Sequence, residues 1–336
     1  MSRTLDQGTL TSLETDDPSR VYKDITAVLC QPRTKLLEIE LLGKSHPIPP
    51  GKNFLYEENS LAISKVTLVQ AFVAARQIFS RLLRGCPDGR SDELRNATAV
   101  ILLMDPEHLT AANARKRLIQ AHPKGPDGDL KAVLKQELLF VNSFLTSRLH
   151  RHTKSPTLWG HRRWVLEISQ SLQIENDVGA EFRHIVLVAA ERHPRNYYAW
   201  SHARWMVNNF GVVDETQSAI LHATQDWCLR HPYDTSGFSF LLFCLAPQDC
   251  SDNPGQEDIS EDVFRNILRL AISFQWTHES VWVFLRTLAA SRISRLSGTP
   301  SFEEEVAGLQ AACPEDHHAQ LTLKGAIEWS RKYHGN

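Results

Sequence analysis

The sequence twice places an indole, an imidazole and a guanidinium at the same spacing. Both runs read W-x-H-x-R-W, and they hold Trp159, His161 and Arg163, then Trp200, His202 and Arg204. Residues four apart share one face of a helix, so each guanidinium can stack on the indole one turn before it. The spacing therefore favours contacts between packed helices. For the two histidines it favours hydrogen bonds between hairpins over catalysis.

The motifs of an independent enzyme are missing from the sequence. It has no Gly-rich phosphate loop, no G-x-S-x-G and no H-E-x-x-H. Six cysteines stand without C-x-x-C spacing: Cys30, Cys86, Cys228, Cys244, Cys250 and Cys313. This pattern predicts a reducing, cytoplasmic environment, no disulfide framework and no metal site in this chain.

The charge balance and the hydropathy argue against a nucleic-acid-binding protein and against a membrane-spanning protein. Among 336 residues, 37 Lys and Arg face 39 Asp and Glu, a formal net charge of −2. Such a balance gives no electrostatic reason to expect a nucleic-acid partner. No run reaches the roughly 18 apolar residues that a membrane span needs. We therefore expect a globular chain without a membrane span.

The paired motifs belong to a longer internal repeat. Weaker copies carry Phe238 and Trp282 in the place of the tryptophan, and a degenerate copy carries Ala112. We call the residue at the tryptophan position of each copy its anchor. The five anchors, at 112, 159, 200, 238 and 282, are 47, 41, 38 and 44 residues apart. About 40 residues supply two helices and two turns, so each repeat is expected to be a helical hairpin.

Capping residues should open the second helix of each hairpin. Ser155 and Asn196 precede two of the anchor helices and are expected to be their N-caps. Pro156 suits a first helical position, where no amide hydrogen needs a partner. For the degenerate repeat, Asp105 is predicted to cap a helix over 105–121 that begins with Pro106.

These elements predict an all-α fold, a right-handed α-α solenoid of stacked antiparallel helical hairpins. Residues 1–60 are expected to form an N-terminal arm, partly irregular or extended, with a short strand or extended segment over 36–42. Residues 61–336 are expected to form the repeat domain, with motifs near 105–121, 155–170, 196–210, 234–245 and 278–293.

The pattern P-x-N-Y-x-x-W-x-H-x-R, repeated about every 40 residues over residues 100–290, resembles the protein prenyltransferase α-subunit repeat. The segment 193–205 is the best copy, and the variants at 155–164, 234–238 and 278–282 look most like the branch of α-subunit-repeat-containing proteins, similar to a type III geranylgeranyltransferase α subunit. The resemblance implies a crescent of hairpins around a separate β subunit. That subunit holds the catalytic zinc, which activates the acceptor cysteine for attack on an isoprenyl diphosphate.

The resemblance also assigns site residues. Lys154, five residues before Trp159, matches the lysine that stabilises the departing diphosphate, although Pro156 fills the family's tyrosine position. At the corresponding positions of the next repeat, the resemblance implies four substrate-binding residues: Arg195, Asn196, Tyr197 and Tyr198. The remaining motif residues are expected to pack the repeats together: Trp159, His161, Arg163, Trp200, His202, Arg204, Phe238 and Trp282.

Two functions from different classes follow. The first is the α subunit of a heterodimeric prenyltransferase that uses a Rab-type geranylgeranyltransferase β subunit and modifies a C-terminal cysteine of a protein substrate. The second is a helical-repeat adaptor without a transferase role. Ala112 at an anchor and Pro156 at the tyrosine position favour the adaptor.

Overall fold

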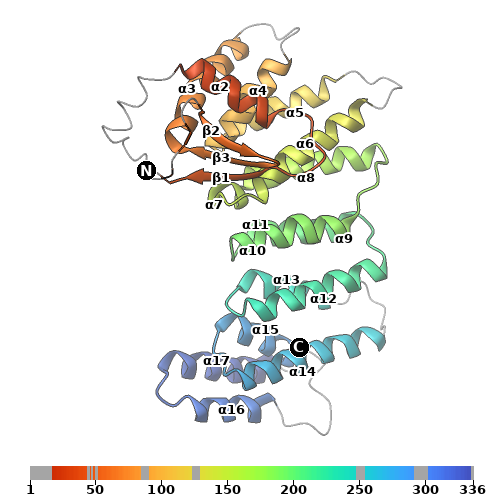
Figure 1. Cartoon of the computed structure of the whole chain (residues 1–336). Helices are drawn as coiled ribbons and strands as arrows, with labels where there is room; N and C mark the ends of the chain where they lie inside the picture. The colour runs from red at the N-terminus through yellow and green to blue at the C-terminus, as the bar shows by residue number, and fades with distance from the viewer. Residues whose placement is uncertain are drawn as a thin grey trace. The chain divides into compact units, whose positions relative to one another are not determined.

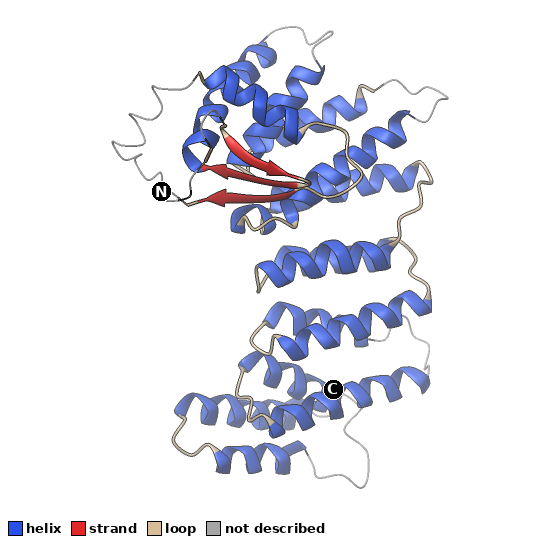
Figure 2. Ribbon diagram, viewed as in Figure 1, coloured by secondary structure: helices blue, strands red, loops and turns tan. Residues whose placement is uncertain are grey.

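The structure is a computed structural model that describes residues 17–43, 46, 48–49, 52–84, 91–122, 129–246, 254–290 and 302–333. Cys86, Cys250 and both ends of the chain lie outside the described residues. Figure 1 labels the elements, and Figure 2 separates helices from strands. The chain divides into two compact units: residues 1–177 with 184–202, and residues 178–183 with 203–336.

Unit 1 begins with a helix that rests on two others. In α2 (Pro18–Leu29), Asp17 accepts a hydrogen bond from the amide of Ser19, and Pro18 occupies the first turn. One face of the helix buries Val21, Ile25 and Leu29. The helix packs against α3 (Lys65–Arg84) and α4 (Ser91–Met104). This helix lies within residues 1–60, for which an arm, partly irregular or extended, is predicted.

A small sheet follows α2 (Figure 2). It has the order β1-β3-β2, with β1 (Glu38–Leu42) parallel and β2 (Phe54–Glu57) antiparallel to β3 (Ser60–Ser64). The central strand is the buried one, and Leu61 and Ile63 are fully enclosed. Strand β1 falls within the predicted extended segment 36–42. The predicted domain boundary between residues 60 and 61 stays a prediction.

The long helix α3 follows β3 directly. It is the one described helix that is long and apolar enough to cross a membrane. Half of its most apolar window is buried in the protein, and α3 packs against α2 and α4. We therefore interpret α3 as a core helix.

The rest of unit 1 consists of paired helices. Helix α4 packs on α5 (Leu109–Gln120), and α6 (Asp129–Leu145) packs on α8 (Pro156–Ser171), with the short α7 (His150–Thr153) between them. The division between the units falls within the next run of elements: α9 (Val178–Glu181), a π-helical turn η1 (Phe182–Val186), α10 (Leu187–Arg192) and α11 (Tyr197–Asn209).

Unit 2 repeats the same architecture with its own core. Its remaining helices are α12 (Asp214–Arg230), α13 (Thr235–Leu245), α14 (Pro254–Ser273), α15 (Glu279–Ala290), α16 (Phe302–Ala312) and α17 (His317–Tyr333). Helix α13 packs on α12 and α15, and α17 packs on α15 and α16. The predicted all-α helical-repeat fold is confirmed. The right-handed superhelix stays a prediction.

The anchors occupy equivalent places in their helices. Each is the fourth residue of its own helix and is at most 4% exposed: Ala112 in α5, Trp159 in α8, Trp200 in α11, Phe238 in α13 and Trp282 in α15. Two of the indoles donate to the carbonyl six residues earlier, from Trp159 to Thr153 (2.8 Å) and from Trp282 to Trp276 (2.7 Å). The five repeats therefore share a buried position along the helix, although the residue type at that position varies.

The caps explain this regularity. Ser155 Oγ accepts from the amide of Leu158 (3.0 Å), and Asn196 Oδ1 accepts from that of Ala199 (3.2 Å), so both predicted N-caps are confirmed. The predicted cap Asp105 is wrong. Its amide donates to the carbonyl of Ile101 (2.8 Å), so Asp105 follows the end of α4, whereas His108 Nδ1 caps α5.

Candidate functional site

Two turns of unit 1 gather positively charged and imidazole side chains. One turn joins α7 to α8 and carries Lys154, and the other joins α10 to α11 and carries residues 193–196. We call the following five residues the basic turn cluster: His150, Lys154, Arg192, His193 and Arg195. The family resemblance pointed to two of them, Lys154 and Arg195.

Lys154 links the two turns directly. Its ammonium Nζ donates to the carbonyl of Pro194 at 2.9 Å, and the side chain is half-buried. The backbone before it is fixed by the carbonyl of Thr153, which accepts from Trp159 Nε1 (2.8 Å) and from Asn196 Nδ2 (2.9 Å). The anchor of one repeat and the cap of the next therefore hold Lys154 in place.

His193 lies beside two other members of the cluster. Its ring lies 5.1 Å from that of His150 in an edge-on arrangement. Burial lowers the pKa of His193, and the neighbouring His150 and Lys154 lower it further. The positive charge of Lys154 would favour a nearby anion, whereas burial disfavours any charged group at this place.

Arginines complete the cluster at its rim. Arg192 donates to the carbonyl of Thr146 and to Glu38 Oε1 of strand β1, the latter at 2.8 Å. Arg195 is exposed and has a φ of 59°, a left-handed conformation that is uncommon for a residue other than glycine. Such local strain is often found at functional turns.

Among the four residues predicted to contact the substrate, Arg195 and the two tyrosines are exposed. Tyr197 is 62% and Tyr198 38% exposed, and their rings meet edge to face at 5.5 Å. Asn196 is fully buried, and both ends of its amide serve the protein's own backbone. Asn196 can thus position the turn, and contact with a substrate falls to its neighbours.

The motif histidines lie in the interior. His161 Nε2 donates to Glu137 Oε1 at 2.7 Å, and the same carboxylate takes two hydrogen bonds from Arg115, at 2.8 and 2.6 Å. We call Arg115, Glu137 and His161 the buried ion cluster. Sequence reasoning missed Glu137, although it is the single acidic residue in the apolar segment 130–151.

His202 has a different partner. The guanidinium of Arg162 donates to its Nε2, and Arg162 Nε donates to Asn142 Oδ1 at 2.8 Å. Burial lowers the pKa of Arg162 to about 9, and burial with the nearby Arg162 and Arg163 charges lowers that of His202 far below its usual range. His202 is therefore neutral, which lets Nε2 act as an acceptor.

The other motif arginines lie closer to the surface. Arg204 donates to Ser239 Oγ at 2.7 Å, and its guanidinium is 5.9 Å and 5.8 Å from the ring centroids of Phe240 and Phe243. Arg163 is half-buried. The predicted stacking of each arginine on its own tryptophan stays a prediction. Within the described ranges, no three His, Cys, Asp or Glu side chains gather as metal ligands.

His152 couples the site to pH, because it anchors α7 just before Lys154. Its Nε2 lies 3.0 Å and 2.9 Å from the carbonyls of Leu102 and Leu103, and burial lowers its pKa from 6.5 to about 4. The unfolded chain then binds more protons than the folded chain between these values. Stability is full above pH 6.5 and falls as the pH drops toward 4, by roughly 3 kcal/mol from this residue.

We expect urea unfolding of the full chain, measured at several pH values between 6.5 and 4, to show this loss. His152→Gln should reduce the slope of the unfolding free energy against pH, because the amide stays neutral. The matched control is His184→Gln, which removes an exposed imidazole of the same unit. Equal slopes in the two variants would contradict the assignment to His152.

Comparison with known proteins adds a second kind of information. Residues 158–267 match the family model described as the ECM9 middle domain. The chain is 31% identical over 192 residues to protein prenyltransferase alpha subunit repeat-containing protein 1-B of Xenopus laevis, covering 50% of this chain and 41% of that protein. It is 32% identical over 260 residues to protein prenyltransferase alpha subunit repeat-containing protein 1 of Danio rerio, covering 68% and 56%.

A more distant similarity reaches an enzyme subunit. The chain is 24% identical over 132 residues to the geranylgeranyl transferase type-2 subunit alpha of Dictyostelium discoideum, covering 39% of this chain and 40% of that protein. The chain spans about half the length of the relatives that it matches.

Proposed function

Because the chain belongs to the family of protein prenyltransferase α-subunit repeat-containing proteins, we propose that it is the α subunit of a heterodimeric protein prenyltransferase. In this proposal the partner is a β subunit of the Rab geranylgeranyltransferase type, and that subunit carries the zinc. The protein substrate supplies a C-terminal cysteine, and the compartment is the cytoplasm. The similarity to a geranylgeranyl transferase α subunit supports the transferred group.

The observation that carries the proposal is the basic turn cluster. When the cysteine sulfur bonds to C1 of the isoprenyl chain, the C1–O bond breaks and the diphosphate leaves with the electron pair. Negative charge therefore grows on the leaving group in the transition state. A fixed ammonium at that place lowers the barrier because it needs no reorganisation. The hydrogen bond from Lys154 to Pro194 holds its ammonium between the two basic turns.

Lys154→Ala in the reconstituted heterodimer tests this role. We expect kcat for transfer of a geranylgeranyl group to a peptide with a C-terminal cysteine to fall about 100-fold, the usual loss when one fixed donor at a developing anion is removed. The KM for the peptide should stay unchanged. Stopped assays with labelled geranylgeranyl diphosphate give both constants.

The matched control is Lys131→Ala, which removes an exposed lysine from α6 of the same unit. It should leave kcat within twofold of the unaltered pair. If both variants transfer at the same rate, Lys154 has no part in stabilising the diphosphate. If no β subunit associates with the chain, the heterodimer itself is ruled out.

The adaptor remains the alternative, and one observation favours it. The ammonium of Lys154 already has an acceptor in the chain, so it can serve to join two repeats without any substrate. The two functions differ in a simple measurement. An adaptor would bind a protein partner with no transfer to a cysteine peptide, and Lys154→Ala would then lower thermal stability because the hydrogen bond to Pro194 is lost.

A further inference from the structure

One member of the basic turn cluster is paired with a carboxylate from a distant part of unit 1. Arg192 donates to Glu38 Oε1 at 2.8 Å, and Glu38 belongs to the edge strand β1, 154 residues earlier in the chain. The Arg192 guanidinium also donates to the carbonyl of Thr146, just after α6. A main-chain carbonyl therefore holds one side of the guanidinium, and a side chain that can rotate away holds the other.

This ion pair is open to exchange with another anion. The side chains of Arg192 and Glu38 are 24% and 47% exposed, and ion pairs that water reaches add little free energy. Strand β1 is fixed by its backbone instead. The amide of Glu38 donates to the carbonyl of Asn59 at 2.7 Å. On the other side of the strand, the carbonyl of Ile39 accepts from the amide of Arg148 at 3.3 Å. Only the Glu38 side chain has to turn for Arg192 to accept a different partner.

Arg192 lies among the other basic groups of the cluster. Burial lowers the pKa of His193, and its neighbours lower it further: His150, Lys154 and Arg192. Lys154 supplies a single positive charge, whereas Arg192 supplies a planar guanidinium, which binds the oxygens of a phosphate in pairs. Glu38 presents carboxylate oxygens to the same donors. A phosphate group at these turns and the Glu38 side chain therefore compete for Arg192.

We propose that Glu38 is a competing carboxylate, which occupies Arg192 until a diphosphate anion binds at the basic turn cluster and displaces it. The inference rests on the proposed function for the kind of anion, and it assigns a regulating residue to the N-terminal sheet. An anion with several charges displaces the single charge of Glu38 more readily than a monoanion does. Glu38 thereby favours a diphosphate over singly charged anions at this site.

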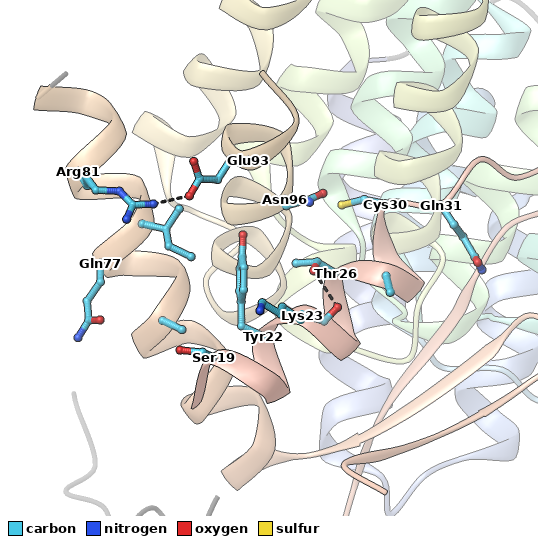
Figure 3. A pocket seen from close by; sticks show the side chains of 13 residues that line it. Ser19, Tyr22, Lys23, Thr26, Cys30, Gln31, Gln77, Arg81, Glu93 and Asn96 are labelled. Atoms are coloured by element: carbon cyan, nitrogen blue, oxygen red, sulfur yellow. Dashed lines mark hydrogen bonds and ion pairs between the residues drawn. The ribbon is translucent and has the colours of Figure 1, made fainter. Parts of the chain in front are cut away.

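A second arginine–glutamate pair of unit 1 provides a control. Figure 3 shows Arg81 paired with Glu93 in the groove along α2, which Lys23 also lines. The side chains of Arg81 and Glu93 are 59% and 35% exposed, so this pair is also open to water. The groove shares no residue with the basic turn cluster. Glu93→Gln therefore removes the same charge from unit 1 at a different basic place.

Calorimetric titration of inorganic pyrophosphate into the full chain tests the proposal, at low ionic strength, where exposed charges are least screened. We expect Glu38→Gln to lower the Kd about fivefold, the gain that follows when one exposed ion pair no longer has to be broken. Glu93→Gln should leave the Kd nearly unchanged. So should Glu40→Gln in the same strand, since the Glu40 carboxylate lies 4.0 Å from Arg148 Nε and not at Arg192.

Arg192→Gln shows whether the effect acts through the guanidinium. In that background Glu38→Gln should gain no more than Glu93→Gln does. An equal gain for Glu38→Gln and Glu93→Gln on the unaltered background would overturn the proposal, because net charge alone would then set the affinity. A Kd that Glu38→Gln leaves unchanged, or a lack of pyrophosphate binding by both the unaltered chain and this variant, would overturn it as well.

The titration needs no β subunit, so it separates this inference from the transferase role. If Glu38→Gln has no effect on pyrophosphate binding while Lys154→Ala still slows transfer in the heterodimer, only the inference about Glu38 fails. If transfer is absent and Glu38→Gln still tightens pyrophosphate binding, the competition at Arg192 stands and the transferase role fails.

Discussion

Glu137→Ala should lower the free energy of unfolding by about 3–5 kcal/mol, because it leaves a buried guanidinium without its counter-charge. Arg115 and Glu137 are 3% and 7% exposed, and two hydrogen bonds join them. Burial alone would raise the pKa of Glu137. The Arg115 charge and the hydrogen bonds from His161 and Arg115 outweigh burial and hold the pKa well below its usual range.

The rest of the buried ion cluster makes this loss hard to relieve. Arg115 also donates to the carbonyl of Arg95 (3.0 Å) and to Thr98 Oγ1 (3.2 Å), and its guanidinium lies 3.9 Å from the ring centroid of Phe140. These contacts keep the guanidinium in place after the carboxylate is gone. Water has no easy route to it, so the charge stays buried and unpaired.

Urea unfolding followed by far-UV circular dichroism measures the effect. The matched control is Glu303→Ala, which removes a carboxylate that takes two similar hydrogen bonds, 2.9 and 2.5 Å, from the exposed Arg331. Surface pairs add little, so its midpoint should hardly move. The interpretation fails if the two variants lose the same stability.

A paired replacement separates the charge from the packing. Arg115→Met combined with Glu137→Leu removes both charges and keeps much of the volume. Buried ion pairs replaced in this way often cost little. We therefore expect the double variant to be clearly more stable than Glu137→Ala alone. A double variant that is less stable would mean that packing by the two side chains, and not their charges, sets the cost.

The sequence predicts those features of the fold whose signals are local. Ser155 and Asn196 cap helices through contacts three residues away, and the anchors repeat because each cap fixes the fourth helical residue. The prediction for Asp105 is wrong although Asp before Pro is a strong helix-start signal. The chain uses Asp105 to end α4 and leaves the cap to His108.

Features that depend on contacts between residues far apart in the sequence were not predicted. Strand β1 pairs with β3, about twenty residues later, and α2 is held by α3 and α4. The basic turn cluster joins residues about 40 positions apart, so only its resemblance-based members were named. Glu137 was missed because its two partners, Arg115 and His161, come from other helices.

The second large effect is expected at an anchor position, when Trp282 in unit 2 is replaced. The indole is 1% exposed, and its Nε1 donates to the carbonyl of Trp276 at 2.7 Å. Trp282→Ala should destabilise the chain by about 3–5 kcal/mol, through lost burial and the cavity left behind. Trp282→Phe should cost less, about 1–2 kcal/mol, because it keeps a ring and loses the donor.

The other repeats explain why Trp282→Phe should cost less stability than Trp282→Ala. The same helical position holds Phe238 in α13, so the architecture accepts a phenyl ring there, and it holds the equally buried Ala112 in α5. In α15 the indole of Trp282 packs near Phe302, with ring centroids 6.2 Å apart, so its removal takes away that contact. Trp329→Ala in α17 is the control, because that indole is only half-buried. If Trp282→Ala and Trp329→Ala shift the urea midpoint equally, position four of the helix has no special role in holding the repeat together.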